Sequence, residues 1–124
     1  MKLRILGDAI RLRLTQGEVA ELAQRGTVKS AVHFDASMLT YAITCRHDTR
    51  ALRAEYRAHT ILILAPSALV REWATSEVVG LYEEQPLSDG ASVLRIAIEK
   101  DFACLSPRIG EDDSDAFSNP RSTC

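Results

Sequence analysis

The sequence predicts an α+β fold in which a hairpin–helix–hairpin unit occurs twice. Three observations support this prediction. Short runs of alternating apolar and charged residues, the period of a half-buried strand, recur along the chain. Two other segments have apolar residues at helical spacing, and each is flanked by strand-like runs on both sides. The same order of elements therefore occurs in each half of the chain.

The first half is expected to contain two hairpins. The stretches "KLRI" (2–5) and "IRLRL" (10–14) alternate, and the Gly7-Asp8 pair between them supplies turn residues. The stretches "TVKSAVHF" (27–34) and "MLTYAITC" (38–45) form the second expected hairpin, with "DAS" as the turn.

A helix is predicted between these hairpins at Glu18–Arg25. Thr15 and Glu18 have the spacing of a capping box, in which each side chain accepts a hydrogen bond from a free amide of the first turn. Gly26 follows the last apolar position and is a typical C-terminal stop.

The second half repeats this order. It contains an expected hairpin at 53–56 and 60–66, a helix at Ala68–Ser76, and a hairpin at 78–87 and 91–99 around an "SDG" turn. A shift of the first half by 51 residues superimposes apolar positions of the two halves. These pairs include Ile10 with Ile61, Val19 with Val70, and Leu22 with Trp73. A chance alignment of two amphipathic units is the alternative to a true duplication.

These elements predict one duplicated domain over residues 1–105, with repeats at about 2–46 and 52–101. One unit alone has too few strands to bury its sheet face and its helix, so the two halves are expected to pack together. The expected architecture is pseudo-twofold, with two helices on a bent antiparallel sheet or a small barrel. Residues 106–124 form an acidic C-terminal segment outside the repeats.

Composition and charge limit the function classes. The chain has 124 residues, 46% of them hydrophobic, and a net charge of −2, with 6% aromatic residues. These values argue against nucleic-acid binding, which needs a basic surface with stacking aromatics. Three cysteines without framework spacing suit a reducing compartment, and no stretch has the roughly 20 apolar residues of a membrane span. We expect a cytoplasmic protein without a membrane partner.

Six arginines on the predicted strands are the candidate anion-binding residues. They are Arg4, Arg11, Arg13, Arg53, Arg57 and Arg95. In a barrel interior their guanidinium groups would bind phosphates, and Glu55, Glu83, Glu84 and Glu99 would hold a divalent ion. The favoured interpretation is a solvated outer face, because interior arginines would displace residues such as Leu12 and Ile63 from the core.

No catalytic residue, metal site or cofactor is predicted. The acidic run contains Asp113 and Asp115 at alternate positions, as in a calcium-binding loop. Ser118 stands where that loop needs glycine, and no glutamate closes it. The sequence also has no Gly-x-Ser-x-Gly motif and no glycine-rich phosphate loop.

The exit from the last strand is a candidate anchor for the C-terminal segment. The candidate anchor residues are Phe102, Cys104, Leu105 and Phe117. Phe117 is an aromatic residue in an otherwise polar run, and it gains free energy by burial, so we expect a tethered segment rather than a free one.

Two stretches carry a resemblance to a known family. They are "IRLRLTQGEVAELAQRGTV" (10–28) and "IEKDFACL" with "EDDSDAFSNP" (98–105 and 111–120). Together they resemble a family of small bacterial proteins known only as a domain of unknown function. The resemblance implies a single-domain cytosolic bacterial protein and transfers no activity. The chain departs from the family pattern at Ser118, where proline is common, and it continues to Cys124.

The leading functional hypothesis is a non-catalytic binding or interaction module. Its C-terminal segment would dock on the body or on a partner, and a protein partner or a homo-oligomer remains open. The alternative is a barrel that binds or hydrolyses phosphoesters through the strand arginines and a divalent metal.

Overall fold

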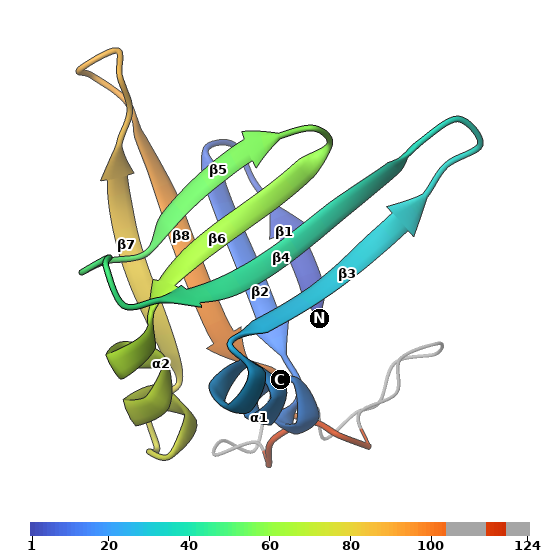
Figure 1. Cartoon of the computed structure of the whole chain (residues 1–124), viewed down its shortest axis with the longest axis vertical. Coiled ribbons are helices and arrows are strands. Elements are labelled where there is room, and N and C mark those ends of the chain that lie inside the picture. Colours follow the sequence, from blue (N-terminus) through green and yellow to red (C-terminus); the bar gives the residue numbers. More distant parts are fainter. Residues whose placement is uncertain (104–113, 119–124) are drawn as a thin grey trace.

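The structure is a computed structural model, and it describes residues 1–103 and 114–118. The chain forms eight strands and two helices, in the order expected from the sequence (Figure 1). The elements are β1 Lys2–Ile5, β2 Ala9–Leu14, α1 Gln16–Arg25, β3 Thr27–His33, β4 Met38–Arg46, β5 Arg53–Arg57, β6 Thr60–Pro66, α2 Ser67–Ala74, β7 Gly80–Pro86 and β8 Val93–Lys100. The predicted α+β class is confirmed.

The strands form two open four-stranded sheets. Sheet A has the order β1-β2-β8-β7, and sheet B has the order β3-β4-β6-β5. Each sheet consists of two antiparallel hairpins that meet through one parallel pair, β2 with β8 and β4 with β6. The sheets are therefore mixed, whereas the sequence led us to expect antiparallel pairing throughout. Alternation of apolar and polar residues is the same for both pairings, so this signal does not distinguish them.

Both sheets bury their inner faces in one core. Leu12 pairs with Ile98 in sheet A, Ile63 pairs with Ile43 in sheet B, and all four side chains are fully buried. The helices lie side by side at one end of the sheets, and Val19, Leu22, Val70 and Trp73 extend the same core (Figure 1). The hairpin loops lie toward the opposite end in Figure 1.

The two helices begin differently. Thr15 and Glu18 form the predicted capping box of α1, and Gly26 ends the helix with φ of 80°. α2 follows β6 directly, and its N-cap residue Pro66 makes no side-chain cap hydrogen bond. α1 is therefore fixed at both ends by local sequence, whereas α2 depends on the burial of Val70 and Trp73.

The two halves share one scheme of strand pairing. Replacing β1, β2, β8 and β7 by β5, β6, β4 and β3 converts the strand order of sheet A into that of sheet B. A duplication of the hairpin–helix–hairpin unit would produce this topology, and the duplication itself stays a prediction.

Candidate functional site: a groove on the outer face of sheet A

The outer face of sheet A carries a groove with a volume of about 640 Å³. The outer-face residues that line it are Arg4, Leu6, Ala9, Arg11, Tyr82, Glu84, Arg95 and Ala97. Ile10, Glu83 and Ile96, which alternate with them along the strands, complete the lining. We call this feature the sheet A groove.

Strand register explains why these residues meet. Arg11 pairs with Arg4 on β1 and with Ala97 on β8, and Ala97 pairs with Tyr82 on β7. In the next row Ala9 pairs with Arg95, which pairs with Glu84. Neighbouring strands lie about 4.8 Å apart and successive outward residues about 6.7 Å apart. The two alanines are therefore diagonal neighbours, and they form a floor between arginines.

The structure brings together four of the six candidate arginines. Arg4, Arg11, Arg13 and Arg95 lie on the outer face of sheet A, whereas Arg53 and Arg57 lie on β5 of sheet B. All six are on strand faces that point away from the shared core, so none lines an interior tunnel. The phosphate-binding barrel therefore lacks the interior arginines that it needs.

Ion pairs neutralise most of these arginines to different degrees. Glu99 lies 3.1 Å from Arg11 and 3.8 Å from Arg13, and its side chain is only 15% exposed. Arg95 lies 3.7 Å from Glu84, but both side chains are largely exposed, so this pair contributes little. Among the residues that the structure describes, no ion pair is found for Arg4.

Tyr82 lines the groove, and Glu99 fixes the position of its side chain. The Tyr82 hydroxyl donates a hydrogen bond of 2.6 Å to Glu99 Oε2. Partial desolvation of the hydroxyl and its hydrogen bond to the Glu99 carboxylate raise the pKa of Tyr82 to about 12, so the hydroxyl stays protonated near neutral pH. Gly80 makes this contact possible, because a Cβ atom there would lie 2.9 Å from the Tyr82 hydroxyl. The Tyr82 side chain is thereby held in a defined position beside Ala97.

The candidate acidic ligands do not converge. Glu83 and Glu84 are consecutive residues of β7 and point to opposite faces of sheet A. Glu99 of the same sheet is already engaged with Arg11 and Tyr82, whereas Glu55 lies on β5 of sheet B. Within residues 1–103 and 114–118, there is no group of three or more His, Cys, Asp or Glu residues that could hold a metal ion. The described residues thus offer no built place for the divalent ion of the hydrolase hypothesis.

Sequence reasoning missed several groove residues. It did not single out Ala9 and Ala97, which form the floor, or Leu6 and Tyr82, which flank it. Small residues on a strand carry no signal of their own, and their meeting depends on the parallel pairing of β2 with β8. The exposure of Leu6 (69%) and Tyr82 (60%) becomes informative only once the groove is known.

The sequence profile of a family of unknown function, DUF7009, matches residues 1–121. The chain belongs to this family. No curated protein and no solved structure matches it. Membership in DUF7009 therefore brings no activity with it, and the bacterial origin implied by the resemblance stays a prediction. Neither helix in the described part has the length and apolar character to cross a membrane.

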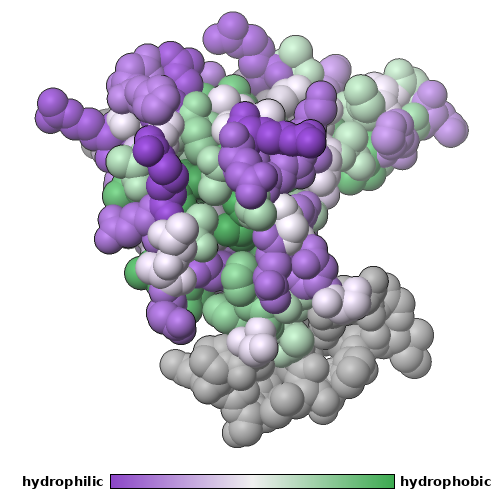
Figure 2. Space-filling model, turned by 60° about the horizontal axis from the view of Figure 1, so that its bottom comes forward, coloured by the Kyte–Doolittle hydropathy of each residue, from purple (hydrophilic) through white to green (hydrophobic). Residues whose placement is uncertain are grey.

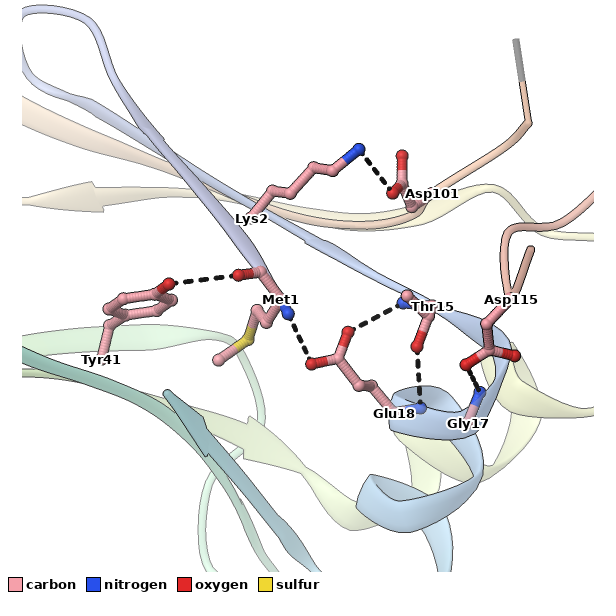
Figure 3. Close-up of polar contacts among 8 residues, drawn as sticks. All are labelled: Met1, Lys2, Thr15, Gly17, Glu18, Tyr41, Asp101 and Asp115. Carbon is pink, nitrogen blue, oxygen red and sulfur yellow. Dashed lines mark hydrogen bonds and ion pairs between the residues drawn. The ribbon is translucent and has the colours of Figure 1, made fainter. Parts of the chain in front are cut away.

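The C-terminal part of the DUF7009 match contacts the start of α1. Gly17 N donates to Asp115 Oδ2 at 3.1 Å, Gln16 N donates to the Asp115 carbonyl at 2.9 Å, and Gln16 Nε2 donates to the Ala116 carbonyl (Figure 3 shows the first contact). A carboxylate at this position also interacts favourably with the helix dipole. Residues 114–118 are thus attached to the body.

Phe117 packs against the end of β8. Its ring centroid lies 5.6 Å from that of Phe102, and Lys100 Nζ lies 5.4 Å from the Phe117 centroid. The Phe117 amide donates to the Asp101 carbonyl at 2.8 Å. Of the predicted anchor residues, Phe102 and Phe117 are in contact, and Cys104 and Leu105 lie outside the described residues.

A second network joins β1 to the same region. Glu18 accepts from Thr15 N at 3.0 Å and from the Met1 amino group at 2.5 Å, while Lys2 Nζ lies 3.0 Å from Asp101 Oδ2 (Figure 3). The Tyr41 hydroxyl of β4 donates to the Met1 carbonyl at 3.2 Å, which links the two sheets. These contacts fix β1, and therefore Arg4, in place beside β2.

Proposed function

We propose that this chain is a non-catalytic binding module and that the sheet A groove binds a small anionic ligand. The observation that carries the proposal is a groove of about 640 Å³ with an alanine floor, an arginine rim, and one arginine without an ion pair in the described part. Ligand pockets of small molecules typically have volumes of about 300–1,000 Å³.

The arrangement of cations on β1 and β2 supports this proposal over a solvated surface. Arg4 lies directly opposite Arg11, and Lys2 lies directly opposite Arg13. Like charges at directly opposed positions destabilise a sheet. Asp101 and Glu99 offset this cost at Lys2, Arg11 and Arg13. Arg4 has no such partner among the described residues, so an anionic ligand would offset the cost that remains.

On the face drawn in Figure 2, hydrophilic residues form most of the outline, and hydrophobic residues lie together nearer the centre. Exposed apolar side chains elsewhere include Val32, Phe34 and Met38 at the β3–β4 hairpin. In the interaction-module hypothesis, a protein partner or a second copy would dock at that hairpin.

The test is an NMR titration of the ¹⁵N-labelled protein with a panel of small carboxylates, phosphate esters and sulfate esters. We expect saturable shifts of the Ala9, Arg11 and Ala97 amides with at least one anion. An Ala97→Leu substitution fills the floor without changing charge and should remove these shifts. Ala31→Leu, at an exposed position of β3, is the matched control and should leave them intact. A panel in which no anion moves the groove amides would refute the proposal.

Hydrolysis is tested separately, because binding alone does not distinguish the two hypotheses. The protein is incubated with p-nitrophenyl phosphate and Mg²⁺, and release of p-nitrophenolate is followed by absorbance. We expect binding without turnover. Release that exceeds the buffer rate and is lost in an Arg11→Gln variant would overturn the non-catalytic part of the proposal.

Three sequence-based expectations belong to the same proposal. The shared element order and strand pairing of the two halves support an internal repeat. The contacts of Asp115 and Phe117 support docking of the C-terminal segment on its own body rather than on a partner. A cytoplasmic location rests on the sequence alone.

A further inference from the structure

We propose that the ligand of the sheet A groove is a small phosphate monoester. Its phosphate group is dianionic, and we infer that its organic part is flat and apolar. This inference rests on the proposed function and specifies its ligand. It follows from the net charge of the face, the spacing of two guanidinium groups and the shape of the floor.

The charge of the outer face indicates a dianion. Its bases are Lys2, Arg4, Arg11, Arg13 and Arg95, and its acids are Glu84, Glu99 and Asp101, which directly follows β8. Five bases and three acids leave a net charge of +2. Glu83 is not counted, because it pairs with the buried Ile96 and alternates along β7 with the outward-facing Tyr82 and Glu84. A phosphate monoester carries a charge of about −1.5 to −2 at pH 7, because its second pKa is about 6. A monoanion such as a single carboxylate or a sulfate ester would leave the face with residual positive charge.

Arg4 and Arg11 supply the fork for this group. They are directly paired across β1 and β2, so their side chains start about 5 Å apart and on the same face. Arginine binds phosphate oxygens with two parallel N–H donors, and a phosphate has three terminal oxygens to share between two guanidinium groups. Arg11 is partly held by Glu99, while Arg4 has no acid partner among the described residues. Arg4 is therefore the residue whose charge the ligand would satisfy.

The floor determines the rest of the ligand. Ala9 and Ala97 leave the sheet surface low between Arg11 and Arg95, and the exposed side chains of Leu6 and Tyr82 stand at its sides. A flat apolar body would cover the two alanine methyl groups and contact Leu6 and the Tyr82 ring. Inorganic phosphate alone would leave this surface exposed to water. An acidic peptide would offer carboxylates singly, without three oxygens on one atom.

The experiment compares four probes at pH 8 by NMR titration. They are phenyl phosphate, phenyl sulfate, inorganic phosphate and phenol. Phenyl sulfate has the shape of phenyl phosphate but a single negative charge, inorganic phosphate has the charge without the body, and phenol has the body without the anion. Loss of one charge-assisted hydrogen bond weakens binding by about tenfold or more, so phenyl phosphate should bind at least about tenfold more tightly than each of the others.

Two variants assign the charge to Arg4. Arg4→Gln should lower the affinity for phenyl phosphate on the order of tenfold and change the affinity for phenyl sulfate less. Arg57→Gln is the matched control, because Arg57 is an exposed strand arginine on sheet B. It should change neither the affinity for phenyl phosphate nor that for phenyl sulfate. Thermal unfolding of each variant shows that the fold is retained.

The outcomes separate this inference from the proposed function. Equal affinities for phenyl phosphate and phenyl sulfate would overturn the claim that the ligand is a dianion. Equal affinities for phenyl phosphate and inorganic phosphate would overturn the claim that it has a planar apolar part. In either case the groove would still be an anion site. If none of the three anions shifts the groove amides, both this inference and the proposed function fail. An unchanged phenyl phosphate affinity in Arg4→Gln would overturn the assignment to the Arg4–Arg11 fork.

Discussion

Sheets A and B have the same strand order and the same inner chemistry, yet the outer positions of their two central strands differ. On the inner side, Leu12 and Ile98 of sheet A occupy the places that Ile63 and Ile43 occupy in sheet B. On the outer side, the pair Arg11 and Ala97 of sheet A corresponds to Leu62 and Ala42 of sheet B. The next outer pair is Arg13 and Glu99 in sheet A but Leu64 and Thr44 in sheet B.

This difference separates the demands of folding from those of binding. Burial requires branched apolar side chains at the inner positions of both sheets, and both sheets have them. Neither topology nor core packing requires arginines on the two central strands, since sheet B reaches the same fold with leucine at the equivalent positions and carries Lys29, Arg53 and Arg57 on its edge strands. The position of Arg11 and Arg13 at the centre of sheet A therefore calls for another explanation, and the groove supplies one. The outer face of sheet B has a smaller hollow of about 260 Å³, lined by Glu55, Arg57, Thr60 and Leu62.

The largest expected effect tests the equivalence of the inner faces. Ile43→Ala and Ile98→Ala each remove a fully buried side chain, so each should lower the free energy of unfolding by about 2–5 kcal/mol. Urea denaturation measures both losses. Val32→Ala, at an exposed position of β3, is the control and should cost much less. A loss at one isoleucine only would show that the two sheets do not share one core.

The secondary structure could be predicted from the sequence because its signals are local. The capping box of Thr15 and Glu18 and the stop at Gly26 lie within one short segment, and the structure contains both. The alternating runs likewise define the strands. The parallel pairing of β2 with β8 joins residues more than 80 positions apart, and no local signal encodes it.

The groove could be predicted only in part, for the same reason. Arg4, Arg11, Arg13 and Arg95 were recognised as a chemical type, but their convergence follows from the β2–β8 pairing. The shift of 51 residues also fails after α2. Leu81 of β7 occupies the place of Val28 in β3, a shift of 53, because the connection from α2 to β7 is longer than that from α1 to β3. A constant shift of 51 residues would place Val79 there.

A second prediction concerns the edges of the two sheets, where β7 and β5 approach each other. The Gln85 side chain accepts from Ala54 N at 2.7 Å and donates to the Ala54 carbonyl at 3.3 Å, so one amide satisfies both backbone groups of an edge strand. Gln85→Ala leaves these partly buried groups unpaired and should cost about 1–2 kcal/mol.

The direct measurement for Gln85→Ala is hydrogen exchange at the Ala54 amide, which should become faster. Gln85→Glu is the companion variant, because it keeps the acceptor for Ala54 N and loses the donor, and it should retain more protection. Unchanged exchange in Gln85→Ala would mean that this contact does not hold the two sheets together at this edge.

A third prediction compares the two helices. Asp115 adds a second acceptor at the start of α1, whereas α2 begins without a side-chain cap. Asp115→Ala should lower stability by about 0.5–1 kcal/mol through loss of the hydrogen bond from Gly17 N and of the dipole interaction. Asp115→Asn keeps an acceptor oxygen and should cost less. Asp35→Ala, in the exposed β3–β4 turn, is the control. If Asp115→Ala lowers the free energy of unfolding no more than Asp35→Ala does, attachment through Asp115 is refuted.

The smallest expected effect compares two tight hairpin loops. The β1–β2 loop has Gly7 at φ of 55°, while the β5–β6 loop has two non-glycine residues in the left-handed region, Ala58 (φ 51°) and His59 (φ 58°). Asparagine tolerates this conformation better than alanine, so Ala58→Asn should raise the free energy of unfolding by several tenths of a kcal/mol, up to about 1 kcal/mol. Gly7→Ala should act in the opposite direction, and for conformational reasons alone, since no atom lies within 4 Å of the added Cβ. Thermal unfolding measures both changes. If Ala58→Asn lowers stability instead, the Ala58 methyl group makes a contact that outweighs the backbone strain, and the loop of sheet B would then be specified by packing rather than by turn chemistry.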